Sequence, residues 1–391
     1  MRNRWGILAV LFTVRLTMAF QFQSVAAVAP LLGTKFGVSL ADIGILIGLY
    51  FTPGIALALP GGAIGQKFGD KATVTFALAL MLIGELAMAA SEQWGWQIAG
   101  RLVAGGGGVL LNVLMTKMIT DWFAGKEIAT ALAVFVNSWP AGIAISLLIL
   151  PAIGVAHGIA AVYLSVASLI AIGIVLLLAG YQAAPGVTTA SVAAARPDGR
   201  AILAVIAAGL IWGLFNTGFA IIFSFGPSLL AERGWSITAA GSAISIVLWL
   251  SVASVPAGGF LADRFKRPHA IMTAGFIVVA ALMLALPRSE TVIAVVIALG
   301  LVGGLPAGPI MSLPASTLAP ATRAIGMGIF YTVYYAVMML GPVGGGACAK
   351  WYGTAAAAFD FGAVTALLCL PLLLAFNRIV TAGIRPAAVR I

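Results

Sequence analysis

Long apolar stretches alternate with short polar breaks along the whole sequence. A helix needs about 20 apolar residues to cross the hydrocarbon core of a bilayer. Cutting the chain at charged, Gly/Pro-rich or amphipathic breaks leaves twelve such stretches, near residues 5–32, 41–61, 72–90, 96–118, 128–150, 154–181, 200–229, 237–260, 269–287, 291–317, 324–347 and 354–377. The sequence therefore predicts an all-α membrane protein with twelve transmembrane helices.

Composition supports this class. The chain is 62% hydrophobic and only 8% charged, a balance that soluble globular domains do not have. Short segments of alternating hydrophobicity, which a membrane β-barrel would need, are absent from the sequence. The two cysteines, Cys348 and Cys369, lie in separate apolar stretches. We therefore expect no disulfide framework, no metal site and no cofactor.

The basic residues indicate the topology. With the N-terminus inside, the inner segments contain fifteen of them: Arg2, Arg4, Lys67, Lys71, Lys117, Lys126, Arg196, Arg200, Arg264, Lys266, Arg267, Arg323, Arg378, Arg385 and Arg390. The outer segments contain Lys35, Arg233, Arg288 and Lys350. The positive-inside rule then predicts a protein of the plasma (inner) membrane with both termini in the cytoplasm. The net charge of +10 reflects this asymmetry, so nucleic acid is not an expected partner.

The chain also shows an internal repeat. Residues 182–199 are polar, rich in small side chains and without apolar periodicity, which favours a linker between halves 1–181 and 200–391. A shift of 197 residues aligns Pro30 with Pro227, Leu32 with Leu229, Gly37 with Gly234, Ser39 with Ser236, Gly44 with Gly241, Gly62 with Gly259 and Lys67 with Arg264. Two six-helix bundles in the same orientation form a parallel repeat, which can rock about a central site.

Two loops carry a common motif, 62-GAIGQKFGDK-71 and 259-GFLADRFKRP-268. They resemble the signature loop of the major facilitator superfamily: Gly, three residues, Asp, a basic residue, any residue, Gly and further basic residues. The first copy has Gln66 in place of the acid, and the second has Lys266 at the second glycine. The stretch 101-RLVAGGGG-108 resembles a second superfamily motif. Together with the spans and the repeat, the resemblance covers essentially the whole chain.

The resemblance implies alternating access between two six-helix bundles. The phosphate-binding loop G-x-x-x-x-G-K-[ST] is absent, so we expect neither nucleotide hydrolysis nor enzymatic activity. Residues 20–32 and 60–71 also loosely resemble the cyanate and nitroimidazole porter branch.

The loop motif implies a conformational latch on the cytoplasmic side, with Asp121 as the partner of Lys67 or Lys71. The proposed latch residues are Gly62, Lys67, Lys71, Asp121, Gly259, Asp263, Arg264 and Arg267. The alternative is that these are ordinary loop charges of the positive-inside type.

Arg15 lies ten residues into the first span, about 15 Å deep at the helical rise. A charge at this depth costs about 2.5–3.5 kcal/mol even on the insertion scale. It is expected to face the protein interior and to contact substrate. Two alternatives remain: a structural pair with Glu85, which is the acid well inside a span, and a misplaced span boundary.

Other polar and aromatic residues lie near the middle of predicted spans. Gln21 and Gln23 face different sides of one helix, and Gln23 is preferred for the cavity that Arg15 faces. Arg101 could instead organise a proton path or a helix contact. The proposed substrate-binding residues are Arg15, Gln23, Asn112, Asn137, Trp139, Trp212, Asn216, Tyr331 and Tyr335, with Tyr334 on the face of the last two. Packing or hydrogen bonding between helices is the alternative for each.

Two arginines against one glutamate within spans favour a small (organic) anion as the transported solute. We also expect that a proton or another ion is coupled to transport, and that the protein is a monomer in the lipid bilayer. The main alternative is a proton-coupled drug exporter, disfavoured because the Gly-Pro element lies at 341-GPVGGG-346 rather than in the fifth span. A receptor built on the same fold is a further alternative.

Overall fold

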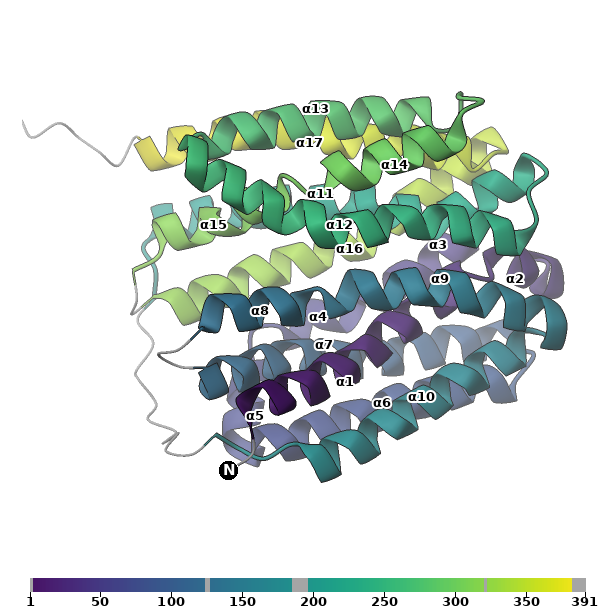
Figure 1. Ribbon diagram of the computed structural model, residues 1–391, viewed down its shortest axis with the longest axis horizontal. Helices are drawn as coiled ribbons and strands as arrows, with labels where there is room; N and C mark the ends of the chain where they lie inside the picture. Colours follow the sequence, from purple (N-terminus) through teal and green to yellow (C-terminus); the bar gives the residue numbers. More distant parts are fainter. Residues whose placement is uncertain (1–2, 124–126, 185–195, 320–321, 382–391) are drawn as a thin grey trace, which may run out of the picture.

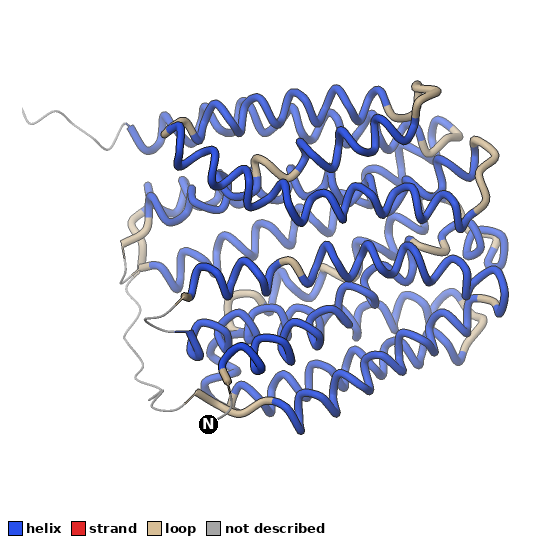
Figure 2. The backbone as a smooth tube through the Cα atoms, in the orientation of Figure 1, coloured by secondary structure: helices blue, strands red, loops and turns tan. Residues whose placement is uncertain are grey.

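The computed structural model describes residues 3–123, 127–184, 196–319 and 322–381. Within these ranges the chain forms helices and loops without a strand (Figure 2). Twelve helices or helix pairs are long and apolar enough to cross a membrane, which confirms the predicted all-α fold. The helices are α1 (Arg4–Ala26), α2 (Ala29–Phe36), α3 (Leu40–Leu49), α4 (Thr52–Leu57), α5 (Gly61–Phe68), α6 (Asp70–Ala90), α7 (Trp94–Phe123), α8 (Ile128–Val136), α9 (Ser138–His157), α10 (Ile159–Gly180), α11 (Gly199–Glu232), α12 (Ile237–Phe265), α13 (Pro268–Ala285), α14 (Val292–Gly303), α15 (Ala307–Thr317), α16 (Arg323–Tyr352) and α17 (Ala356–Thr381).

Several spans are interrupted next to prolines. The break between α1 and α2 precedes Pro30, the break between α3 and α4 precedes Pro53, and α15 begins directly after Pro306. Proline has no N–H to donate to the preceding turn, so the backbone bends at these points. The α8–α9 break at Asn137 likewise lies just before Pro140. These breaks leave carbonyl groups inside the bundle that need other partners.

Figure 1 shows α1–α10 together in the lower part of the view and α11–α17 in the upper part. The N-terminus and the end of α17 lie on the same side, called the terminal side below; the opposite side is called the distal side. The predicted linker falls largely on residues 185–195, which lie outside the described residues, as do the basic residues Arg2, Lys126, Arg385 and Arg390.

Glycines bring the two groups of helices into close contact toward the distal side. A Cβ atom on Gly44 or Gly48 of α3 would overlap the carbonyl oxygens of Pro342 or Met339 on α16. A Cβ atom on Gly241 of α12 would overlap the carbonyl of Leu147 on α9. Gly44 and Gly241 are aligned by the 197-residue repeat, so equivalent positions make equivalent contacts.

Candidate functional site

Polar side chains from four spans meet at one depth. Arg15 on α1, Asn112 on α7, Ser138 on α9 and Tyr335 on α16 each lie ten to twelve residues from the terminal-side end of their span. At 1.5 Å per residue this is about 15–18 Å. The structure therefore brings together residues that the sequence placed on separate helices.

Arg15 contacts the break between α8 and α9. Its Nε and Nη2 lie 3.2 and 3.0 Å from Asn112 Oδ1. Its Nη1 lies 3.1 Å from the carbonyl oxygens of both Phe135 and Val136 and 3.2 Å from Ser138 Oγ. The last carbonyls of a helix have no partner within that helix, so the guanidinium group satisfies them, and they in turn stabilise its charge.

Arg15 does not pair with Glu85. The Glu85 carboxylate accepts from Gln21 Nε2 at 3.0 Å, and no ion pair joins it to Arg15 within the described residues. The predicted alternative of a structural pair is therefore wrong. Arg15 also lies well inside α1 and is only 8% exposed, so a misplaced boundary is excluded.

One N–H of Arg15 remains for another partner. Nη2 carries two hydrogens, and its acceptor among the described residues is Asn112. Asn112 Nδ2 donates to the Tyr335 hydroxyl of the other half at 3.2 Å. The Tyr331 and Tyr334 rings lie beside Tyr335, at centroid distances of 6.5 and 5.1 Å. The positive charge of one half thus faces the tyrosines of the other.

Aromatic rings from both halves adjoin this polar cluster. The centroid of the Phe22 ring lies 5.0 Å from that of Phe51, 5.2 Å from that of Trp139 and 5.9 Å from that of Phe223. The Phe51 ring lies 6.2 Å from Tyr335. Phe22, Phe51 and Phe223 were not among the residues predicted from the sequence, because polarity was the main signal for a site residue in the middle of a span. Phe22 follows Arg15 by seven residues and shares its helix face, which was the available signal.

The remaining predicted substrate-binding residues lie in different surroundings. Gln23 Nε2 donates to the Phe223 carbonyl at 2.8 Å, which links the two halves, and its Oε1 has no partner. Asn216 donates to the Trp212 carbonyl of its own helix at 2.8 Å. The Trp212 ring lies 6.2 Å from Tyr334. Asn137 ends α8 beside the carbonyls that Arg15 contacts.

Arg101 makes a helix contact. Its Nε, Nη1 and Nη2 donate to the carbonyls of Leu46, Gln21 and Phe22 at 3.2, 2.7 and 2.5 Å. The guanidinium carbon lies 4.7 Å from the Tyr50 ring centroid. This arginine therefore joins α7 to α1 and α3. A helix contact was one of the two roles expected from the sequence, the other being a proton path.

Asp121 pairs with Lys117 rather than with Lys67 or Lys71, so the predicted pairing is wrong. Lys117 bridges Asp70 at 2.6 Å and Asp121 at 2.9 Å, because it lies one turn before Asp121 and faces the first turn of α6. Lys71 instead donates to the carbonyls of Leu178 and Tyr181 at the end of α10, where a cation is favoured. Lys67 is exposed above the Phe68 ring. Gly62 lies in α5.

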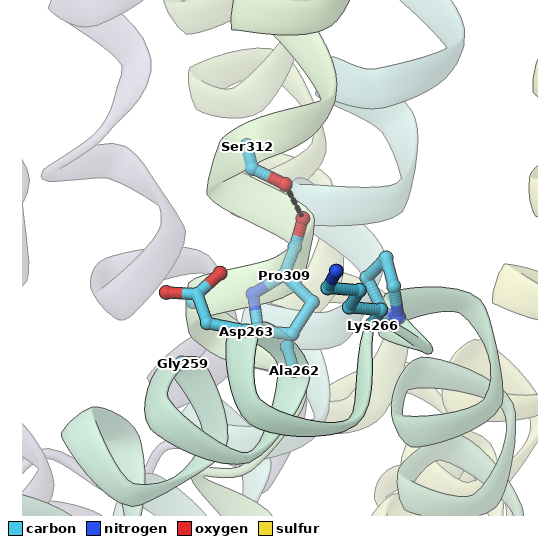
Figure 3. A pocket seen from close by; sticks show the side chains of 8 residues that line it. Gly259, Ala262, Asp263, Lys266, Pro309 and Ser312 are labelled. Atoms are coloured by element: carbon cyan, nitrogen blue, oxygen red, sulfur yellow. Dashed lines mark hydrogen bonds between the residues drawn. The ribbon is translucent and has the colours of Figure 1, made fainter.

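The second copy of the motif borders an open pocket. Asp263, Arg264 and Arg267 are exposed, and their side chains make no hydrogen bond or ion pair with other described residues. Figure 3 shows Asp263 and Lys266 around Pro309, in a cavity of about 470 Å³ that Gly259 and Ser312 also line. Asp263 thus has no partner here.

Lys266 replaces the second glycine of the motif but keeps a positive φ. Its φ of 52° and ψ of 33° are left-handed helical, whereas Gly69, the equivalent residue in the repeat, has a φ of 86° and a ψ of 136°. The two loops therefore turn differently, and Lys266 has a side chain that disfavours its own conformation.

Comparisons with known proteins agree with this architecture. The Major Facilitator Superfamily matches residues 11–228 and again 201–388. The chain is 26% identical over 153 residues to the human choline/ethanolamine transporter FLVCR2, covering 38% of this chain and 29% of that protein. It is 28% identical over 183 residues to the inner membrane transport protein YajR of Escherichia coli, covering 45% and 38%. It is 34% identical over 90 residues to azole resistance protein 1 of Saccharomyces cerevisiae, covering 23% and 14%. The matched segments thus span well under half the length of these relatives.

Solved structures share the fold. A POT family transporter in complex with a thioalcohol conjugated peptide has a TM-score of 0.78 and 13% identity, with 95% of this chain and 96% of that chain covered. The nucleoside transporter NupG has a TM-score of 0.71 and 15% identity, with coverages of 95% and 99%. With the family match over nearly the whole length, these likenesses lead to one conclusion: the chain belongs to the major facilitator superfamily and is a multi-pass membrane transporter, not an enzyme.

Proposed function

We propose that this transporter carries a small organic anion by alternating access. The observation that supports this proposal is the Arg15 guanidinium group, which lies between the halves without a carboxylate partner among the described residues. Its charge is balanced by carbonyl and amide oxygens, so a net positive charge remains. In a desolvated site such a charge favours an anionic ligand.

The aromatic rings define the rest of the proposed ligand. Phe22, Phe51 and Trp139 form an aromatic cluster that contacts Tyr335 through Phe51, and the Phe135 ring lies 4.7 Å from the Arg15 guanidinium carbon. Ring pairs contribute about 0.5–1.5 kcal/mol beyond the area that they bury. A carboxylate attached to a flat apolar group would place its charge on Arg15 and its carbon skeleton on the rings.

The named relatives suggest other substrates. Aromatic rings also bind quaternary ammonium groups such as choline. However, Arg15 would repel a cation at this depth, and no acid of the described residues lies within ion-pair distance to offset it. An anion therefore fits this centre better than choline or ethanolamine.

A binding panel tests the proposal. Benzoate, its neutral amide benzamide, and choline are added separately to the purified protein, and the thermal midpoint is measured. Benzoate is expected to raise the midpoint most, and uptake of labelled benzoate into proteoliposomes should follow. Stabilisation by choline but not by benzoate would overturn the anion assignment.

A proton-coupled drug exporter is the second candidate. The aromatic surface around Phe22 favours it, because apolar drugs bury well against such rings. An azole that stabilises the protein equally with and without the Arg15 charge would support the exporter over the anion transporter.

The orientation and the loops complete the proposal. We place the terminal side in the cytoplasm, because fifteen of the 21 basic residues lie on that side of the predicted spans. Halves 1–181 and 200–391 would rock as units, as a monomer in the inner membrane. The loose similarity to cyanate and nitroimidazole porters stays a prediction.

A further inference from the structure

Glu85 is a buried acid that the proposed anion site does not use. It is 0% exposed and lies fifteen residues from the terminal-side end of α6, about 22 Å at the helical rise, and five residues from the distal end. Its Oε2 accepts from Gln21 Nε2 at 3.0 Å, whereas its Oε1 has no hydrogen-bond partner among the described residues.

No ion pair of the described residues joins Glu85 to a cation. Arg101 from α7 is the neighbouring cation, and three of its five N–H groups donate to the carbonyls of Leu46, Gln21 and Phe22. The other titratable neighbours are Tyr50 at the end of α3 and Tyr163 on α10. The Tyr163 hydroxyl is also buried without a partner.

An ionised carboxylate in such a place is costly. Burying a charge without an ion pair and several hydrogen bonds disfavours the charged form strongly. The Gln21 amide and the nearby Ser24 hydroxyl, which donates to the Gln21 carbonyl, do not compensate for that loss of water. The arrangement therefore suits a neutral carboxyl group, which holds a proton in this conformation.

Three consecutive residues of α1 connect Glu85 to the other half. The side chain of Gln21 binds Glu85. The Phe22 ring contacts Phe223 of α11 at a centroid distance of 5.9 Å, and Gln23 donates to the Phe223 carbonyl at 2.8 Å. A change of charge at Glu85 would thus act on the segment of α1 that contacts α11.

We propose that Glu85 is a proton-binding site, separate from the Arg15 site, whose loss of a proton rearranges the α1 contact with α11 and so drives alternating access. Deprotonation creates a charge beside Arg101 and draws its donors away from the carbonyls of α1. The inference rests on the transport function proposed above but not on the identity of the solute.

Infrared spectroscopy tests the proton site directly. The full-length protein, without added solute, is titrated with base, and the carbonyl stretch of a protonated carboxyl group is followed. The wild type is expected to lose this band as pH rises, and Glu85→Gln should lack it. Glu92→Gln is the matched control, because Glu92 lies seven residues further on with a side chain that is 85% exposed. Absence of the band in the wild type, or its persistence in Glu85→Gln, would overturn the proposal.

Distances between the halves test the coupling. Spin labels are placed at the exposed Thr116 of α7 and Ser316 of α15 through Thr116→Cys and Ser316→Cys, after replacement of Cys348 and Cys369 by alanine. The distance distribution is expected to shift between mildly acidic and mildly alkaline buffer in the otherwise wild-type protein and in Glu92→Gln. Glu85→Gln should keep the acidic distribution at both pH values.

A pH-dependent shift that survives in Glu85→Gln would overturn the coupling, as would its absence from the wild type. Glu85→Asp keeps a carboxyl group and should restore the shift. This variant separates loss of the proton site from a packing defect as the cause of the result in Glu85→Gln. Because no solute is present, failure here leaves the anion proposal standing, and failure of the benzoate panel leaves this proposal standing.

Discussion

Arg15 is the residue whose replacement tests the central site most directly. Arg15→Gln removes the charge that faces the tyrosines of α16. Benzoate binding is expected to weaken by about tenfold or more, since a hydrogen bond to a charged group contributes about 1.5–3 kcal/mol. Arg15→Lys should restore only part of the affinity, because an ammonium group lacks the planar fork that contacts Asn112 and two carbonyls together. Calorimetric titration measures both effects.

Arg4→Gln is the matched control for this prediction. It makes the same substitution on the same helix but removes only contacts at the terminal side, the pair with Glu127 and the contact with the Phe123 ring, so benzoate affinity should be unchanged. Folded Arg15→Gln protein that binds benzoate like the wild type would contradict the anion site and favour the drug exporter.

Lys266 allows a prediction about stability. Its left-handed conformation costs a non-glycine residue about 1–2 kcal/mol. Lys266→Gly should therefore raise the thermal midpoint. The gain is reduced because glycine makes the unfolded chain more flexible. Gly69→Lys in the other copy, at a φ of 86°, should lower it. If the loop charge rather than the backbone determined stability, the thermal midpoint would not rise in Lys266→Gly and fall in Gly69→Lys. That result would contradict the prediction.

Sequence reasoning found Arg15, Asn112 and Tyr335 because polar groups in the middle of a span are costly and therefore rare. It did not find the partners of Arg15, since the carbonyls of Phe135 and Val136 become available only where α8 ends. It also missed Lys117 as the partner of Asp121, although a spacing of four residues on one helix was visible in the sequence.

At the scale of elements, the contact between α3 and α16 depends on glycine. A methyl group at Gly44 would overlap the backbone of Pro342, which cannot move aside as a flexible side chain can. Gly44→Ala should therefore separate the two helices at the distal side. The labelling rate of the native Cys348, half-buried on α16, is expected to rise in a Cys369→Ala background.

Gly95→Ala provides the comparison, because a Cβ atom at Gly95 meets nothing within 4 Å. Its Cys348 labelling rate should equal that of the parent protein. A rate in Gly44→Ala that also stays at the parent value would show that the helices absorb the methyl group without separating.

The number and order of spans could be predicted because length and hydropathy determine them. The breaks within spans could not be located, since proline marks a region of disruption but tertiary contacts decide which turn opens. Thus the first predicted span, 5–32, proved to be α1 and α2 with a break at Ala27 and Val28.

At the scale of the whole molecule, the second loop motif should act on conformation rather than on binding. Asp263 has no partner among the described residues and borders an open pocket. Asp263→Asn is expected to slow benzoate exchange in proteoliposomes and to leave the benzoate dissociation constant largely intact. Weaker binding with normal exchange would assign Asp263 to the substrate site and contradict the latch.

The repeat was visible in the sequence, but how its two copies meet was not. Gly44 and Gly241 appeared there as aligned glycines among many. Their equivalent contacts across the two halves depend on which helices face each other, and a single chain of apolar helices does not encode that order by periodicity alone.

The distal contact between the halves includes glycines against backbone carbonyls, the Phe22–Phe223 ring contact and a side-chain hydrogen bond from Gln23 to Phe223, and no ion pair of the described residues crosses it. Dissolved salt weakens exposed charge pairs but not dry steric contacts. The threshold for opening on that side should therefore change little when the surrounding water changes from dilute to saline, since the charge interaction across it, between Asp42 and Lys350, is longer than an ion pair. The terminal loops, with their clustered arginines and lysines, remain exposed to such changes, so the transporter would respond more strongly to the ionic strength of the solution on its terminal side than to that of the other solution.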